Sequence, residues 1–411
     1  MSFRKVFFWL HLVAGLVAGL SIGIMCFTGT TLAFESELVS WSERSVRRVT
    51  PPQPDAPRLS LDVLQKNVRE YDEEAKPTGI IVSADPAAAV VFSLGRDGAL
   101  YVNPYTGEVK ESPESNWVHD FLHLMEDWHR VLGRSGDSRP IGKAINGACN
   151  LAFFFLAASG LYLWWPRSWS WRGFKAIAVI NLKSSGKARD FNWHNAIGLW
   201  CAPVLIVLTL TAVPISYRWG SNLVYQLVGE EPPVQQGPGA APAAPSVDIP
   251  KPPEGTRPLG YAALLAAVRQ TAPDAELITF RLGGLNRAQR PSGANASNAR
   301  PAGESAQPPA QRRGPQPVSV TVKQLGAWPR TATTTLTLNP YTGEVLKRET
   351  FSDLSAGRRL RTWTRFLHTG QALGWVGQAI AGLACLGGCF LVYTGFALAW
   401  RRFFFKKKSA A

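Results

Sequence analysis

The stretch FNWHNAIGLWCAPVLIVLTLTAVPISY, residues 191–217, runs for 27 residues without Asp, Glu, Lys or Arg. A helix needs about 20 apolar residues to cross the hydrocarbon core of a bilayer, so this stretch predicts a membrane-spanning helix. Residues 6–34, 144–166 and 366–400 are equally free of charge and long enough. We therefore expect four spans, over 6–34, 140–166, 191–217 and 366–400. The first is too long for the apolar region of a secretory signal, so we expect it to be retained.

The flanks of these spans indicate their orientation. Lys and Arg are frequent in residues 1–5, 167–190 and 401–411, and basic flanks tend to stay in the cytoplasm. We therefore expect cytoplasmic termini, a cytoplasmic loop over 167–190 and a basic cytoplasmic tail over 401–411. Residues 35–130 and 218–365 are then periplasmic, and the protein lies in a bacterial inner membrane. The net charge of +15 is partly this signal, so the expected partner is a lipid bilayer and not nucleic acid.

The chain is internally duplicated. LYVNPYTGEVK at residues 100–110 recurs as LTLNPYTGEVL at 336–346, with NPYTGEV identical in both. Asn-Pro followed by Thr-Gly, between alternating apolar residues, predicts a tight turn between two strands. Each copy follows a predicted helix and precedes a membrane span, so we expect two α+β domains, over 35–130 and 218–365. Residues 283–317 are rich in Gly, Pro, Ala and Arg and predict a disordered insertion in the second domain.

All five cysteines lie within the apolar spans. No disulfide is therefore expected in the external segments, although their compartment is oxidising. The chain also lacks a C-x-x-C-H motif, which argues against covalent haem attachment. We interpret these thiols as small residues that pack between helices.

Four of the six histidines lie at paired depths near the ends of the spans. His11 and His194 begin the motifs HLVAG and HNAIG near the cytoplasmic ends. His129 and His368 begin HRVLG and HTGQA near the external ends. Residues i and i+4 share one helix face, so a small residue at i+4 leaves a flat slot beside the imidazole. These small residues are Gly15, Gly198, Gly133 and Ala372.

A porphyrin needs such a slot if a ring nitrogen is to reach its iron. Two facing helices would then give bis-histidine ligation, which is typical of an electron-transfer haem without an open position. The sequence therefore predicts two haem b cofactors. Their iron ligands are His11 with His194, and His129 with His368.

Alternatives remain open at these positions. Each histidine could be a hydrogen-bonded core residue, and a proton relay is possible although the spans contain no carboxylate. Zinc fits less well, because no Asp, Glu or suitably placed Cys completes a tetrahedral shell. Within WVHDFLHLMEDWHRVLG, residues 117–133, His123 is the alternative to His129 as external ligand. Arg361 and Arg365 could neutralise haem propionates or contact lipid headgroups.

Two sequence features carry a resemblance to a known family. GLYLWWPR at residues 160–167 and the paired NPYTGEV turns are similar to the PepSY-associated transmembrane helix family, over nearly the whole chain. The resemblance implies four membrane helices, two PepSY-like periplasmic domains and b-type haems. The matching ligand positions are His11, His194, His129 and His368. Some members of the family are di-haem ferric-siderophore reductases, which implies a function in iron uptake.

These features together predict an oxidoreductase that carries electrons across the inner membrane to ferric iron in a siderophore. The electron source is not encoded, because no G-x-G-x-x-G follows a predicted strand and the 167–190 loop is short. A separate cytosolic reductase or a membrane quinol must supply electrons. The alternative is a non-catalytic PepSY membrane protein that binds a periplasmic peptide, protease or transporter partner.

Overall fold

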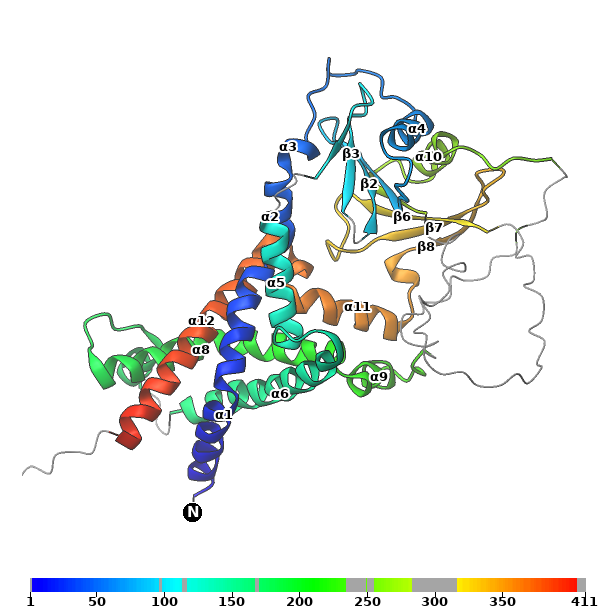
Figure 1. The fold of residues 1–411 in the computed structure, drawn as a ribbon. Coiled ribbons are helices and arrows are strands. Elements are labelled where there is room, and N and C mark those ends of the chain that lie inside the picture. Colours follow the sequence, from blue (N-terminus) through cyan, green and yellow to red (C-terminus); the bar gives the residue numbers. More distant parts are fainter. Residues whose placement is uncertain are drawn as a thin grey trace, which may run out of the picture.

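The computed structural model describes residues 2–95, 98–112, 117–166, 170–233, 249, 255–282 and 316–404. A bundle of long helices carries a sheet domain (Figure 1). We call the helix ends that connect to this domain the sheet side and the opposite ends the far side. Most of the predicted insertion, residues 283–315, and most of the basic tail, residues 405–411, lie outside the described residues.

Among the residues that the structure describes, four helices are long and apolar enough to cross a membrane, which confirms the predicted number of spans. They are α1 (Phe3–Leu32), α6 (Arg139–Trp164), α8 (Gly186–Ser216) and α12 (Trp375–Phe404). Helices α1 and α8 each pack against both α6 and α12. The first helices of the two halves are therefore diagonal partners in the bundle.

The fourth span differs from the uncharged stretch 366–400 that predicted it. Residues 366–368 end a separate helix, α11 (Ala356–His368), and a short 3-10 turn, η5 (Gln371–Leu373), precedes α12. Gly370 and Gly374 have φ of 74° and 65° and interrupt the helix on either side of η5. Lack of charge identifies residues that tolerate lipid but does not detect such a break. His368 therefore ends a short helix and does not begin the fourth span.

Eight strands form one antiparallel sheet in the order β4-β3-β2-β1-β5-β6-β7-β8. The strands of the first half are β1 (Gly79–Ser83), β2 (Val90–Ser93), β3 (Ala99–Val102) and β4 (Val109–Glu111). Those of the second half are β5 (Ala275–Arg281), β6 (Val318–Gln324), β7 (Thr334–Leu338) and β8 (Val345–Glu349). Helices α4 (Leu61–Tyr71) and α10 (Tyr261–Thr271) lie side by side on this sheet (Figure 1).

The two α+β units are therefore not separate domains. Strand β1 pairs with β5, with Ile81 opposite Thr279, and one apolar core contains residues of α4, α10 and strands of both halves. An unpaired strand edge exposes its N–H and C=O groups, and pairing β1 with β5 removes one such edge from each half. The sequence predicted the repeated unit, and the structure joins its two copies into one domain.

The NPYTGEV repeats form the predicted turns, between β3 and β4 and between β7 and β8. In each copy the Asn side-chain oxygen, of Asn103 or Asn339, accepts a hydrogen bond at 2.9 Å from the backbone N–H two residues on. Gly107 and Gly343 have φ of 76° and 73°, a conformation that favours glycine. The identity of the two motifs thus follows from one shared turn geometry.

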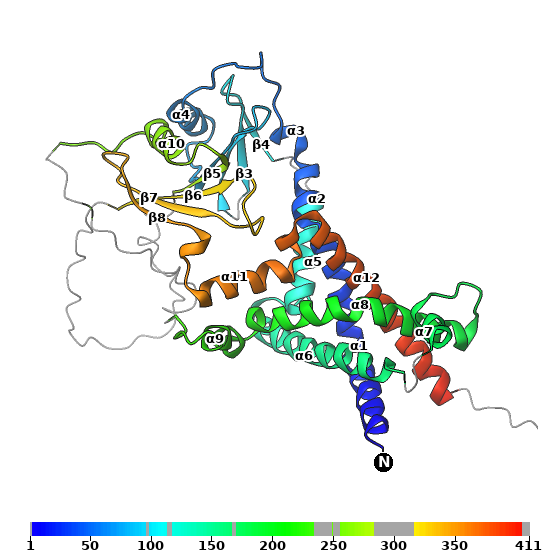
Figure 2. The ribbon, with the colours of Figure 1, turned by 180° about the vertical axis from the view of Figure 1, so that it is seen from behind.

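Shorter helices connect the bundle to the sheet. The first half contains α2 (Glu35–Ser42), α3 (Arg44–Arg47), α5 (Trp117–Val131) and the 3-10 turn η2 (Gly136–Ser138). The second half contains α9 (Arg218–Gln226), the 3-10 turn η4 (Phe351–Asp353) and α11. Helix α7 (Trp171–Ala178) lies on the far side. Helix α11 lies between the sheet and α8 (Figure 2), as α5 packs on α1 and α6.

Two cysteines occupy notches between the long helices, as the sequence predicts. A Cβ atom at Gly388 would collide with the sulfur of Cys26, and one at Gly387 would collide with that of Cys201. All five cysteines are free thiols. The pairing of glycine with cysteine lets α12 approach α1 and α8 closely.

Asp190 links α8 to α12 on the far side. Its side chain is 1% exposed and accepts hydrogen bonds from Arg189 at 2.9 Å and Arg401 at 3.1 Å. Removing this charge leaves both guanidinium groups poorly paired, so we expect Asp190→Asn to lower the free energy of unfolding by about 1–3 kcal/mol. The thermal unfolding midpoint in detergent measures this. Asp137→Asn, at an exposed aspartate, is the control, and equal midpoints for the two variants would refute the expectation.

Candidate haem-binding site

The four histidines predicted as ligands lie in two tiers. His11 on α1 and His194 on α8 each lie eight residues after the first residue of their helix, and we call this pair the far tier. His129 and His368 lie in the last turns of α5 and α11, and we call this pair the sheet-side tier. Each tier takes one histidine from each half of the duplication.

The sheet-side tier brings two imidazole rings close together across the bundle. The ring centres of His129 and His368 are 6.2 Å apart, and the ring planes are inclined by 50°. Two imidazoles that share one metal through bonds of about 2 Å have ring centres roughly 6 Å apart. The separation therefore fits two axial ligands of a single iron.

The far tier lies on the diagonal helices α1 and α8. His194 is close enough to His11 for the charge of one ring to affect the other. Each ring lies against a glycine of the adjacent helix: a Cβ at Gly160 of α6 would be 3.5 Å from His11 Cε1, and one at Gly395 of α12 would be 3.6 Å from His194 Cε1. The two rings thus occupy equivalent notches in the two halves.

Each histidine is hydrogen-bonded through Nδ1 to a neighbouring helix. His11 Nδ1 lies 2.8 Å from the Ser159 hydroxyl on α6, and His194 Nδ1 lies 2.9 Å from the Thr394 hydroxyl on α12. In the other tier, His129 Nδ1 lies 2.9 Å from the Thr28 hydroxyl on α1. His368 Nδ1 lies 2.9 Å from the Leu208 carbonyl on α8 and 3.5 Å from the Thr211 hydroxyl.

These contacts define which ring nitrogen carries the proton. The hydroxyls of Thr28 and Thr394 donate to carbonyls four residues earlier in their own helices, at 2.7 Å each, so their lone pairs face the imidazole. The Leu208 carbonyl at His368 can only accept. At His129, His194 and His368, Nδ1 is therefore the donor, and Nε2 keeps a lone pair that could bind a metal. In the described part of the chain, Nε2 of these four histidines makes no hydrogen bond.

Burial keeps the sheet-side histidines neutral. It lowers the pKa of His129 to about 4, with the nearby His368 as the second cause. Burial likewise lowers the pKa of His368. Only a neutral imidazole offers a lone pair to a metal, so both rings are in the state that ligation requires. The donor set fits haem better than zinc, because no group of three or more His, Cys, Asp or Glu suits a metal ion among the residues described.

The small residues four positions after the histidines do not form one motif. A Cβ at Gly15 would be 3.8 Å from Leu156, and one at Gly198 would be 3.6 Å from Leu391, so both glycines face equivalent leucines with room beside them. Gly133 is different. Helix α5 ends at Val131, and Gly133 has φ of 68°, so it does not share a helix face with His129.

Leu132 and Gly133 both have positive φ, of 54° and 68°, so the backbone leaves the helical conformation directly after Val131. Ala372 also lies outside the helix of its histidine: it is buried in η5, after α11 has ended. The spacing that singled out His129 and His368 thus has a different physical cause from that at His11 and His194. The structure brings these two histidines together through the ends of α5 and α11.

His123, the alternative ligand on α5, lies away from the tier. Its side chain is 74% exposed and lies 3.9 Å from Glu126. We expect His123→Ala to leave bound haem unchanged, whereas His129→Ala removes one haem. Haem content per chain, measured by pyridine haemochrome absorbance, separates the two variants. Loss of haem from the His123 variant would reassign the ligand.

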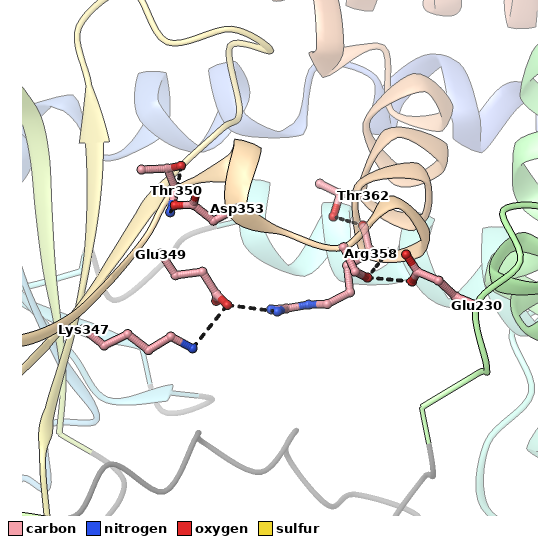
Figure 3. Close-up of polar contacts among 8 residues, drawn as sticks. Glu230, Lys347, Glu349, Thr350, Asp353, Arg358 and Thr362 are labelled. Atoms are coloured by element: carbon pink, nitrogen blue, oxygen red, sulfur yellow. Dashed lines mark hydrogen bonds and ion pairs between the residues drawn. The ribbon is translucent and has the colours of Figure 1, made fainter.

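The arginines of α11 lie on the sheet side. Arg361 donates to the Ser221 hydroxyl at 3.3 Å, and Arg365 is exposed. Arg358 instead forms an ion pair with Glu349 of β8 at 3.2 Å, and this carboxylate also meets Lys347 (Figure 3). Arg358 thus ties α11 to the sheet and leaves Arg361 and Arg365 as candidates for haem propionates.

Sequence reasoning missed the hydroxyl and glycine partners of the histidines. The signal lies in the duplication: Thr28 follows His11 by 17 residues, and Thr211 follows His194 by 17. Gly160 follows Ser159 directly, as Gly395 follows Thr394. An alignment of the two halves pairs these residues, but their contact with the histidines requires the packed bundle.

The fold and these tiers define a four-helix membrane protein with a duplicated α+β unit and paired histidines. The family model described as the PepSY-associated TM region matches residues 8–402. The chain therefore belongs to this family. A comparison with curated proteins finds none that matches the chain.

Proposed function

We propose that this protein is a di-haem b electron-transfer protein that reduces ferric iron bound to a siderophore. The observation that carries the proposal is the arrangement of four histidines in two tiers of the bundle. Each is held through Nδ1, and Nε2 has no hydrogen-bond partner among the described residues. When bound in pairs of imidazoles, haem b accepts and releases single electrons without an open coordination position. Two such groups at different depths would let electrons cross the bundle.

The residues of the chain would perform four tasks in this function. The four histidines would bind the metal, and Ser159, Thr394 and Thr28 would orient three of the rings. Thr394 and Thr28 would also keep the proton on Nδ1. The Leu208 carbonyl does the same for His368. Arg361 and Arg365 would balance the charge of propionates on the sheet side. The apolar helices exclude water from both tiers.

The orientation is part of the proposal. Basic residues flank the far side, including Arg4 and Lys5 before His11 and Arg401 and Arg402 at the end of α12. This distribution supports a cytoplasmic far side and a periplasmic sheet domain in a bacterial inner membrane. Electrons would enter at the far tier from a separate cytosolic reductase or a quinol. The acceptor would meet the sheet-side tier.

The absorption spectrum of the purified protein tests the proposal. We expect a reducible low-spin spectrum with two haems per chain, and reoxidation of the dithionite-reduced protein by a ferric siderophore. The proposal would be wrong if the protein contained no haem after purification from haem-replete cells. The non-catalytic alternative predicts that replacing all four histidines by Ala leaves cellular function intact.

A further inference from the structure

The hairpin between β2 and β3 differs from its counterpart between β6 and β7. In the first half, residues 94–98 connect β2 and β3. In the second half, the longer segment 325–333 connects β6 and β7, and β6 has seven residues where β2 has four. A duplicated fold does not need this extension. The extended hairpin loop begins with Leu325 and Gly326, as the first-half loop begins with Leu94 and Gly95, but it also carries Trp328 and Arg330.

The hairpin loop reaches the membrane bundle beside the sheet-side tier. The Trp328 ring lies 6.1 Å from the ring of Trp363 on α11, at 63°. Arg330 Cδ lies 2.9 Å from where a Cβ would sit on Gly374, the residue before α12. Trp328 is nevertheless 64% exposed. The Trp328 ring is therefore held at a defined place by Trp363 and is exposed to solvent.

Trp363 brings this aromatic pair close to the proposed electron exit. It lies five residues before His368 on the same helix, a rise of about 7.5 Å along the axis. His368 is one member of the sheet-side tier. A ligand that stacks on Trp328 and Trp363 would lie at the sheet-side end of the electron path.

The charge around the pair is positive. Helix α11 contains four arginines and no acidic residue, whereas the equivalent helix α5 contains Asp120, Glu126 and Asp127. Arg358 pairs with Glu349 (Figure 3). Within the described residues, the other arginines have no carboxylate within ion-pair distance; they are Arg330, Arg359, Arg361 and Arg365. The two halves thus differ in charge as well as in hairpin length.

We propose that Trp328, Trp363 and Arg330, with the unpaired arginines of α11, bind a ferric catecholate. This inference rests on the proposed function and names the acceptor class. Catecholate rings are planar and aromatic, so they pack on indole rings in offset or edge-to-face arrangements. Their iron complexes carry several negative charges, which arginine binds through charge-assisted hydrogen bonds. A ferric hydroxamate lacks aromatic rings and this charge, so it matches the surface less well.

Calorimetric titration of the full-length protein in lipid nanodiscs tests the inference. The probe is a gallium(III) tris-catecholate, which is not reduced, compared with a gallium(III) tris-hydroxamate. We expect Trp328→Ala to weaken catecholate binding about tenfold and Arg330→Gln to weaken it with a smaller salt dependence. Trp117→Ala is the matched control, since this ring on α5 is 63% exposed and lies twelve residues from His129. The hydroxamate should bind more weakly, and its affinity should be the same in all three variants as in the unmodified protein.

Three results would overturn the inference: unchanged catecholate affinity in Trp328→Ala, equal weakening in Trp117→Ala, or quenching of Trp328 fluorescence by brominated lipid. The last would assign Trp328 to the bilayer. Because gallium accepts no electron, binding is read separately from electron transfer. Catecholate binding that depends on Trp328 in a protein without haem would support this site while removing the proposed function. Normal haem spectra together with unchanged catecholate affinity in Trp328→Ala would support the proposed function and remove this site.

Discussion

Replacing His129 or His368 by Ala is expected to remove one of the two proposed haems and leave the other in place. The two rings have centres 6.2 Å apart and no third candidate ligand lies with them in the described residues, so one lost imidazole leaves the iron with a single protein bond. The other tier draws on different helices, α1 and α8, and should keep its cofactor. Haem content should fall from about two to about one per chain, and reduction of ferric chelates should be lost.

His11→Ala and His194→Ala are the reciprocal variants. They should also leave one haem, but this haem is the one in the sheet-side tier. Redox titration should therefore give one reduction potential for His11→Ala and His194→Ala and a different one for His129→Ala and His368→Ala. His123→Ala serves as the control for removing an imidazole from α5. The assignment of tiers would be wrong if His11→Ala and His129→Ala left the same haem.

Removing the hydroxyl behind a ligand is expected to give the next largest effect. Thr28→Val keeps the shape of the side chain but leaves the Nδ1–H of His129 without its acceptor at 2.9 Å. Loss of such a partner typically lowers metal affinity by 10- to 100-fold, because it frees the ring to rotate and lowers its basicity. Ser159→Ala and Thr394→Val should act in the same way on His11 and His194. The rate of haem loss to an excess of an apo-haem scavenger measures the effect.

The structure supplies two matched comparisons for this prediction. Within the described part of the chain, the Thr31 hydroxyl bonds only to the Phe27 carbonyl in its own helix, so Thr31→Val should retain haem as the unmodified protein does. Thr211→Val should have a smaller effect than Thr28→Val, because His368 keeps its bond to the Leu208 carbonyl. If all these valine variants lost haem at one rate, general destabilisation and not ligand orientation would be the cause.

Several features of the protein follow from residue order alone. The four spans are apparent because transfer of a long uncharged segment into lipid depends on its own composition, whatever its neighbours are. The paired NPYTGEV turns are apparent because an Asn side chain and a glycine with positive φ form the turn within a few residues. The repeat also predicted that each pair of histidines takes one member from each half, and His129 and His368 lie together in this way. Such properties are local, so they are present before any packing.

Other features depend on contacts between distant segments. Lack of charge across residues 366–400 did not reveal the break that Gly370 and Gly374 make after α11, and no local pattern pairs β1 with β5 into one sheet. The partners of the histidine rings come from other helices, so Ser159, Thr394 and Thr28 gained a role only when the bundle assembled. The same holds for Trp328, whose contact with Trp363 joins a hairpin to a helix. Packing places these groups together because each helix must bury its face against whichever neighbour the topology supplies.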